Sequence, residues 1–258
     1  MELNEKAIHR LVKDGERLDG RNLEDFRDIE VETDYINETA EGSARVKFGK
    51  TELVVGVKIG VESPYDDRPG QGTMVTNAEL APMAHREYES GPPQEEGVEL
   101  ARVVDRGIRE SEAIDLEDLC IEEGETVLTV FVDVHVLNMD GNLIDAASLG
   151  AMAALKTGYI PVYDEETNSL ERGEKDRDIP LQKEPITVTG HKINGEILWD
   201  TTGEEEDARD ARLTVSLDDD GNVVAMQKGD RQPFSQEEVM RIIEEAEDKT
   251  DMLRDFLN

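Results

Sequence analysis

Cysteine, aromatic side chains and basic charge are all scarce in this chain. Its 258 residues include one cysteine, Cys120, so no internal disulfide can form and a reducing compartment is expected. Aromatic residues make up 4% of the sequence, and no run approaches the roughly 20 apolar residues that span a bilayer. The first residues also lack the pattern of a secretory signal. We therefore expect a cytoplasmic protein with no membrane partner.

The shortage of basic residues leaves a formal net charge of −34, from 62 acidic and 28 basic side chains. Self-repulsion on this scale destabilises a compact fold in dilute buffer. In molar salt the Debye length falls to roughly 3 Å, so the composition favours a halophilic source. An acidic disordered protein is the alternative, but apolar strand-like runs recur along the chain. Such acidity normally argues against nucleic acid, so the local arginine pattern must identify the partner, and both interpretations stay open.

Hydrophobic periodicity predicts an α+β fold. Alternating apolar positions indicate hairpin-rich antiparallel strands, and the clearest of them, at 126–137, gives one continuous apolar face. The order of elements indicates one domain, 1–258, with two similar halves of sheet and helix. Further segments predicted from the pattern are an N-terminal helix at about 2–14, helices at 97–113 and 143–157, a polar ribbon or loop at 165–178, and a final helix at about 235–256.

The helix near residue 100 carries the most informative side chains. Glu99, Arg102, Arg106 and Arg109 are spaced by three, four and three, which predicts one shared face. Three guanidinium groups on one face could bind phosphates, since each can donate two parallel hydrogen bonds to one phosphate. The alternative is a solvated face on which Glu99 and Asp105 neutralise part of the positive charge. The residues alone favour the solvated face, but three arginines on one face are uncommon in so acidic a chain, which strengthens the case for anion binding.

Two other segments could carry chemistry. The turn at 138–142 enters a helix whose free N–H groups could bind phosphate, although two nearby carboxylates would repel an anion. The hairpin at 192–200 ends in Asp200, beside Trp199, which we assign to the core. The acidic run 204–207 fits a solvated loop. No zinc spacing, nucleotide-binding loop or serine elbow occurs, so no metal or cofactor is expected.

Several stretches together resemble the RNase PH family, and more narrowly the non-catalytic RNase PH-like subunit of the archaeal exosome. Active relatives have Gly-Ser-Arg in the turn, where this chain has Gly141-Asn142-Leu143. They also carry Lys-x-Asp-Gly with a second Asp six residues later, where this chain has Asn194 and Asp200. The resemblance therefore implies an RNase PH-like fold without catalytic residues. The stretches that carry it are Asp19-Gly20-Arg21, 99–106, 132–137 and 192–200.

The resemblance implies a hetero-hexameric ring that alternates this chain with a catalytic RNase PH-like paralogue. RNA-binding proteins would cap the ring, which degrades single-stranded RNA from the 3′ end with phosphate. Arg102 and Arg106 would grip RNA phosphates near the partner's active site, and Arg109 is a further candidate RNA-binding residue. Two alternatives stay open. One is an active homo-oligomeric ribonuclease that uses Asp200 and another acid, and the other is a purely structural subunit without RNA contacts.

Overall fold

The first sheet is centred on β6 (Thr126–Asn138), whose alternating apolar residues are buried as the sequence predicts. The computed structural model describes residues 2–257. In it β6 pairs antiparallel with β3 (Thr51–Glu62) and parallel with β4 (Thr73–Leu80). The sheet order is β1–β2–β3–β6–β4, and a short β5 also pairs with β6. The other bounds are β1 (Ile29–Thr33), β2 (Gly42–Phe48) and β5 (Cys120–Glu122).

The parallel β4–β6 pair corrects the expectation of antiparallel hairpins. Residues 81–125, which include helix α2 (Glu95–Glu110), separate the two strands. A connection of this length crosses over the sheet and returns in the same direction, whereas a short turn would reverse the chain. The crossover lays α2 against β4 and fixes which of its faces remains open.

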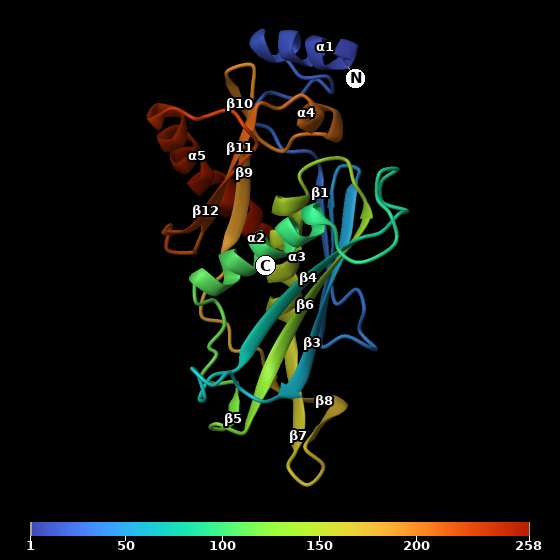
Figure 1. Ribbon diagram of the computed structural model, residues 1–258, viewed down its shortest axis with the longest axis vertical. Helices are drawn as coiled ribbons and strands as arrows, with labels where there is room; N and C mark the ends of the chain where they lie inside the picture. Colours follow the sequence, from blue (N-terminus) through green and yellow to red (C-terminus); the bar gives the residue numbers. More distant parts are fainter. Residues whose placement is uncertain (1, 258) are drawn as a thin grey trace.

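Helix α3 (Leu143–Thr157) has the predicted bounds and lies between the two halves (Figure 1). It contacts β2 and β3 on one side and β9 on the other. A Cβ atom at Gly150 would lie 2.9 Å from a methyl carbon of Val55 and 3.1 Å from one of Leu53. This close approach explains why the sequence fills the helix with glycine and alanine.

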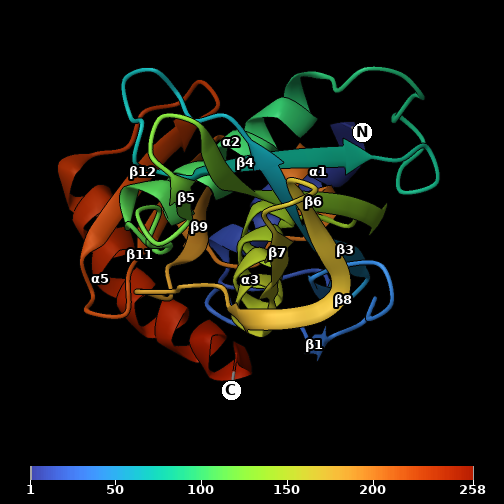
Figure 2. The same ribbon diagram turned by 90° about the horizontal axis from the view of Figure 1, so that it is seen from below.

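The second sheet has the order β10–β9–β11–β12. Its outer face is covered by α5 (Gln236–Arg254), as Figure 2 shows from below. The face toward α2 and α3 is polar: Thr187 bonds Ser216 at 2.8 Å and Thr189 bonds Thr214 at 3.0 Å, hydroxyl to hydroxyl. The strands are β9 (Ile186–Ile193), β10 (Glu196–Leu198), β11 (Ala211–Leu217) and β12 (Val223–Gly229).

The two terminal helices follow their sequence signals. Helix α1 (Glu2–Lys13) packs Ile8 and Val12 against Ile193 and Leu198. Helix α5 begins with the capping box predicted from Ser235 and Glu238, in which each side chain bonds the other's backbone N–H. It is followed by a 3₁₀ turn, Asp255–Leu257, so the helical segment ends close to the predicted residue 256.

A two-stranded ribbon extends from the body at the end opposite to α1 (Figure 1). It consists of β7 (Tyr159–Asp164) and β8 (Ser169–Asp178), and most of β8 is exposed. The polar composition of 165–178 predicted a surface loop or ribbon, and the ribbon is confirmed.

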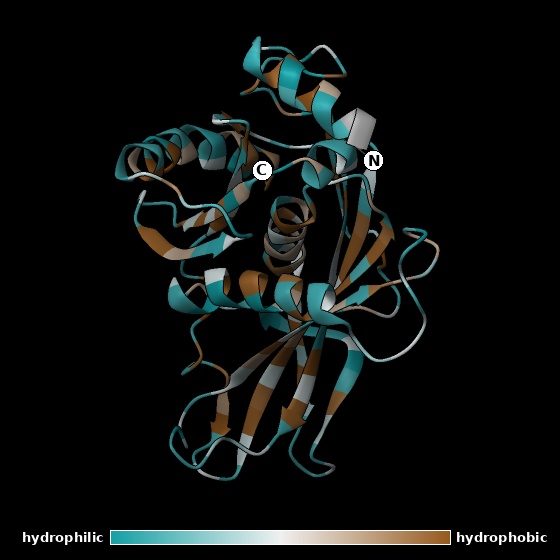
Figure 3. Ribbon diagram, turned by 45° about the horizontal axis from the view of Figure 1, so that its top comes forward, coloured by the Kyte–Doolittle hydropathy of each residue, from teal (hydrophilic) through white to brown (hydrophobic). Residues whose placement is uncertain are grey.

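Apolar residues gather on the inner sides of the sheets and along α3, while polar residues dominate the outer turns of the helices (Figure 3). Trp199 is fully buried, as the sequence predicts, and its indole N–H donates to Glu245 at 2.8 Å. Within residues 2–257 no helix is both long and apolar enough to cross a membrane.

Candidate functional site

Helix α2 buries its apolar face and leaves its arginine face open. Leu100, Val103, Val104 and Ile108 are buried, which confirms the predicted core stripe. Gly107 approaches the second sheet so closely that a Cβ atom there would lie 3.2 Å from the Ser216 hydroxyl. Packing on both sheets therefore holds the helix rigidly and fixes the directions in which its arginines extend.

Arg102 and Arg106 are exposed, one helical turn apart. The Arg102 guanidinium makes no hydrogen bond or ion pair with any residue between 2 and 257. Arg106 makes a single contact, from Nη1 to Oε1 of Gln227 at 3.3 Å. Because Gln227 is neutral, it leaves the charge of Arg106 uncompensated. These two cations are therefore available to an external anion.

Arg109 is also exposed, but it is bound by other groups of the protein. Its Nε and Nη2 atoms donate to the two carboxylate oxygens of Asp105 at 2.9 Å each, and Nη2 also donates to the carbonyl of Met74 at 2.9 Å. The hydrogen bonds to Asp105 raise the pKa of Arg109 above its usual value. The spacing rule therefore groups three arginines, but the structure leaves two of them free and pairs the third.

The acid on this face is also neutralised internally. Glu99 accepts from Nη2 of Arg212 at 2.6 Å and from the amide of Gln227 at 2.7 Å. Arg212 comes from β11 of the second sheet, so the ion pair joins the two halves. It also removes the negative charge that would oppose an anion at Arg102.

The structure separates the two hairpin residues that the sequence pattern had paired. Asn194 is exposed at the β9–β10 turn, and its amide donates to the backbone carbonyl of His9 in α1 at 2.9 Å. Its backbone N–H donates to Asp210 at 2.7 Å. Asn194 therefore anchors the N-terminal helix and does not face Asp200.

Asp200 is completely buried in a cluster of cations. Arg27 donates to it from Nη2 at 2.6 Å, from Nε at 2.9 Å and from its backbone N–H at 2.7 Å. Arg21 adds a contact at 3.1 Å and the Asn142 amide another at 2.9 Å. Burial alone would raise the pKa of Asp200, but the bonds and charge of Arg27 lower it below its usual value.

The acidic run 204–207 is not a solvated loop, and that expectation is wrong. All four residues lie in α4 (Gly203–Asp207), which begins with a capping box between Thr202 and Glu205. Glu205 is buried and receives two bonds from Arg17, at 2.6 and 2.9 Å. The Thr-x-x-Glu pattern at 202–205 is typical of a helix start, so the sequence contained a signal that predicts this helix.

Glu206 is the residue that sequence reasoning missed. Its Oε1 accepts from the backbone N–H of Asn142 at 2.7 Å, at the start of α3, and its Oε2 lies 3.3 Å from Arg209. One backbone donor at this helix start is thus occupied by a carboxylate of the same chain. Glu206 and Asp200 meet at Asn142, whose φ of 55° is left-handed.

Asp145, in the first turn of α3, lies beneath this cluster with no solvent exposure. It accepts from the backbone N–H of Thr189 at 3.1 Å and from its hydroxyl at 2.8 Å. Burial raises the pKa of Asp145 to about 7, although the bonds from Thr189 and Asn142 oppose the rise. A carboxyl that the sequence treated as a repulsive charge is therefore part of a buried joint between the two halves.

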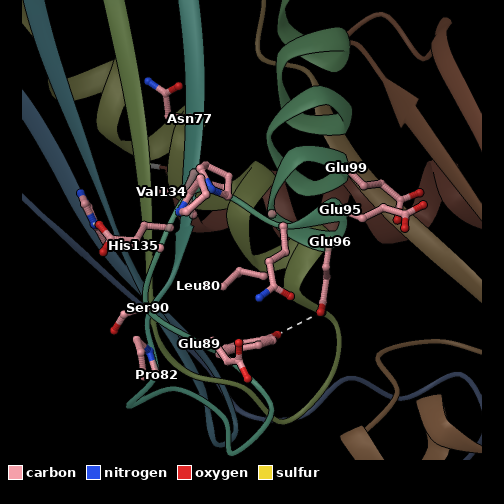
Figure 4. Close-up of a pocket in the computed structure, with 18 of the residues that line it drawn as sticks. Asn77, Leu80, Pro82, Glu89, Ser90, Glu95, Glu96, Glu99, Val134 and His135 are labelled. Atoms are coloured by element: carbon pink, nitrogen blue, oxygen red, sulfur yellow. Dashed lines mark hydrogen bonds and ion pairs between the residues drawn. The ribbon is translucent and has the colours of Figure 1, made fainter.

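An acidic cavity of about 760 Å³ lies beside the first turns of α2 (Figure 4). Glu89, Glu95, Glu96 and Glu99 line it, and the Tyr88 hydroxyl donates to Glu96 at 3.0 Å. Its charge would repel phosphate groups, so this cavity does not extend the arginine surface. No cluster of His, Cys, Asp and Glu in the described part of the chain has metal-binding geometry.

Comparison with known proteins identifies the family. Residues 25–161 match domain 1 of the 3′ exoribonuclease family RNase PH, and residues 183–249 match its domain 2. The chain is 48% identical to the exosome complex component Rrp42 of Thermococcus gammatolerans over 97% of this chain and 92% of the relative. It is also 48% identical to the Methanocella arvoryzae Rrp42, over 99% and 96%.

Solved structures agree with these sequence matches. The structure described as the Archaeoglobus fulgidus exosome with RNA bound to the active site has a chain with a TM-score of 0.93 and 42% identity, covering 100% of this chain and 98% of that one. A second, an archaeal exosome core, has a TM-score of 0.88 and 40% identity over 99% and 96%. The predicted RNase PH-like α+β fold is confirmed, and the chain belongs to the RNase PH family of 3′ exoribonucleases.

Proposed function

We propose that this chain is a ring subunit of an archaeal exosome that holds single-stranded RNA for a catalytic paralogue. The observation that carries the proposal is the pair of uncompensated guanidinium groups, Arg102 and Arg106, on a rigid helix of an otherwise acidic protein. Support for the assembly comes from the relatives, which are named as exosome components and match this chain over nearly its full length. RNA-binding cap proteins would complete the complex.

The arginine pair suits the backbone of unpaired RNA. Guanidinium groups keep their charge at any cellular pH and bond phosphate oxygens in a bidentate manner. Their one-turn spacing on α2 presents both to one strand, and the internal pairing of Glu99 with Arg212 removes the nearest repulsion. Contacts of this kind position a strand without reading its sequence, as an exonuclease requires.

We infer that the chain itself is not catalytic. Asp200 is buried and bound by Arg27, Arg21 and Asn142, so it has no route to a substrate. Glu206 accepts a hydrogen bond from the backbone N–H of Asn142, a group that would otherwise be available to phosphate. An active ribonuclease that uses Asp200 with Glu206 is the rival hypothesis, since both side chains meet at Asn142.

The test uses the ring assembled with its catalytic paralogue and a double variant, Arg102→Ala with Arg106→Ala. We expect the ring to assemble while its affinity for oligoadenylate falls about tenfold or more at matched salt, because two charge-assisted contacts are lost. Arg10→Ala, which removes an exposed arginine from α1, is the matched control and should change nothing. Unaltered RNA affinity in the double variant would favour the purely structural subunit.

The same preparation tests catalysis. The isolated chain, given oligoadenylate and phosphate, should release no nucleoside diphosphate. Release that disappears in Asp200→Asn would replace our proposal with the active homo-oligomer.

We also propose that the protein works in the cytoplasm of a halophile. The support is its composition, with 62 acidic residues against 28 basic ones. Screening of their mutual repulsion should raise the unfolding temperature between dilute buffer and molar KCl. An unfolding temperature that does not rise with salt would count against this habitat.

A further inference from the structure

A second cavity, of about 120 Å³, opens where the two halves of the protein meet. Helix α2 contributes Glu96, Glu99 and Leu100 to its lining, and the start of α3 contributes Leu143 and Ile144. Glu96 and Glu99, which Figure 4 labels on α2, line both this cavity and the acidic one. Strands β9 and β11 supply the polar side. The volume corresponds to about four water molecules at roughly 30 Å³ each, or to one single-ring heterocycle.

The charged groups around this cavity are already paired inside the protein. Arg212 binds Glu99 at 2.6 Å, and Arg209 binds Glu206 at 3.3 Å and Asp230 at 2.8 Å. With Glu96 also in the lining, the carboxylates outnumber the guanidinium groups. A phosphate or another multiply charged anion would therefore be repelled.

Three residues that line the cavity have buried polar atoms without a partner among the described residues: His191, Asn142 and Arg212. The Arg212 atom is Nε of a guanidinium already paired with Glu99, so the unpaired groups of His191 and Asn142 are the neutral ones. His191 is 98% buried, lines the cavity, and has no hydrogen-bond partner for either ring nitrogen among the described residues. Burial and the charges of Arg209 and Arg212 lower the pKa of His191 well below its usual value, so the ring offers one donor and one acceptor. The Oδ1 atom of Asn142 is a second buried acceptor with no partner. Unpaired buried polar atoms are costly, which points to an absent partner.

We propose that this cavity binds a pyrimidine base. The apolar side chains of Leu100, Leu143 and Ile144 would contact the faces of the ring, while Asn142 and His191 would bond its polar edge. The volume suits one ring better than the two fused rings of a purine. Glu99, three residues before Arg102, lines the cavity, so the base could come from a bound RNA strand or from a free nucleoside.

The site is tested on the full isolated chain, without the ring, by calorimetry with uridine, adenosine and inorganic phosphate. We expect uridine to bind and to shift the imidazole ¹⁵N resonances of His191, while adenosine binds at least tenfold more weakly and phosphate does not bind. His191→Phe keeps the ring volume but removes both nitrogens, and should weaken uridine binding about tenfold. Equal binding of adenosine, binding of phosphate, or no change in the His191 resonances would overturn the proposal.

Two controls separate this site from the arginine surface. Arg102→Ala should leave uridine affinity unchanged, so failure of the RNA proposal would not affect this result. The unfolding temperature of His191→Phe shows whether this variant folds. The shift of the His191 ¹⁵N resonances on adding uridine is measured on the wild-type protein and therefore does not depend on the variant. Oligouridylate that binds the isolated chain more tightly than uridine, and loses that advantage in Arg102→Ala, would identify a strand base as the source.

Discussion

Arginine has opposite roles in two regions of this protein. On α2, Arg102 and Arg106 extend into solvent with almost no protein partner. Around the start of α3, the Arg27 side chain is 92% buried and donates four hydrogen bonds to Asp200, Asp140 and Gly141. The arginine charges on α2 are therefore available to an external anion, whereas the charge of Arg27 is neutralised by Asp200 inside the protein.

The comparison shows that burial decides how an arginine charge is used in this fold. A buried charge is stable only with a close partner, so the cluster at Asn142 fills its donors with Asp200 and Glu206. A surface charge has no such requirement, because water solvates it. The Asn142 cluster is therefore a buried joint between the two halves, whereas Arg102 and Arg106 remain exposed on α2.

The largest effect that separates the two regions should come from Arg27→Ala. It leaves the Asp200 carboxylate buried without its main partner, which costs about 3–5 kcal/mol of unfolding free energy. Arg102→Ala should change stability by no more than about 0.5 kcal/mol. Urea denaturation at constant salt measures both. Similar losses in the two variants would mean that the Arg27 cluster is not a structural joint.

Sequence periodicity predicted most of the elements because local spacing determines which face of a helix or strand is apolar. The bounds of α3 and the core stripe of α2 follow from such spacing. The Asp105–Arg109 pair was also readable, since acid and base four residues apart meet on a helix. For Arg109, the alternative in which Asp105 neutralises part of the positive charge therefore describes the structure.

The Asn142 cluster could not be predicted in the same way. Arg27 and Asp200 are separated by 173 positions, and no local pattern pairs them. The comparison with active relatives suggested Asn194 and Asp200 as the altered catalytic pair, but the turn geometry directs Asn194 toward α1. Only the tertiary fold shows that Glu206 is the acid beside Asp200 at Asn142.

A pH titration should sharpen the contrast further. The folded pKa of Asp145 is about 7, above its ordinary value of 3.8, so the folded state holds a proton that the unfolded chain releases. This stabilising contribution is complete below pH 3.8 and is lost as the pH rises to 7, by about 4 kcal/mol at most. Asp145→Asn should therefore flatten the fall in unfolding free energy over that window.

The matched control for this titration is Asp66→Asn, which alters an exposed carboxylate in a loop. Its stability should follow the wild-type pH profile, since this side chain is exposed to solvent. If Asp145→Asn also reproduced the wild-type slope, Asp145 would be ionised in the folded protein and its burial would need another explanation.

The smallest expected effects concern Arg109. They test whether an arginine of α2 that is already paired within the protein contributes to RNA affinity. Arg102→Ala should lower the RNA affinity of the assembled ring about fivefold, the equivalent of roughly 1 kcal/mol for one lost charge-assisted contact. Arg109→Ala should lower it less than about twofold, because Asp105 already holds that guanidinium. Asp105→Asn should release Arg109, remove one negative charge and raise the affinity. Equal losses in Arg102→Ala and Arg109→Ala, with no gain in Asp105→Asn, would show that RNA competes successfully for the paired arginine, so that pairing in the free protein does not decide which arginines bind.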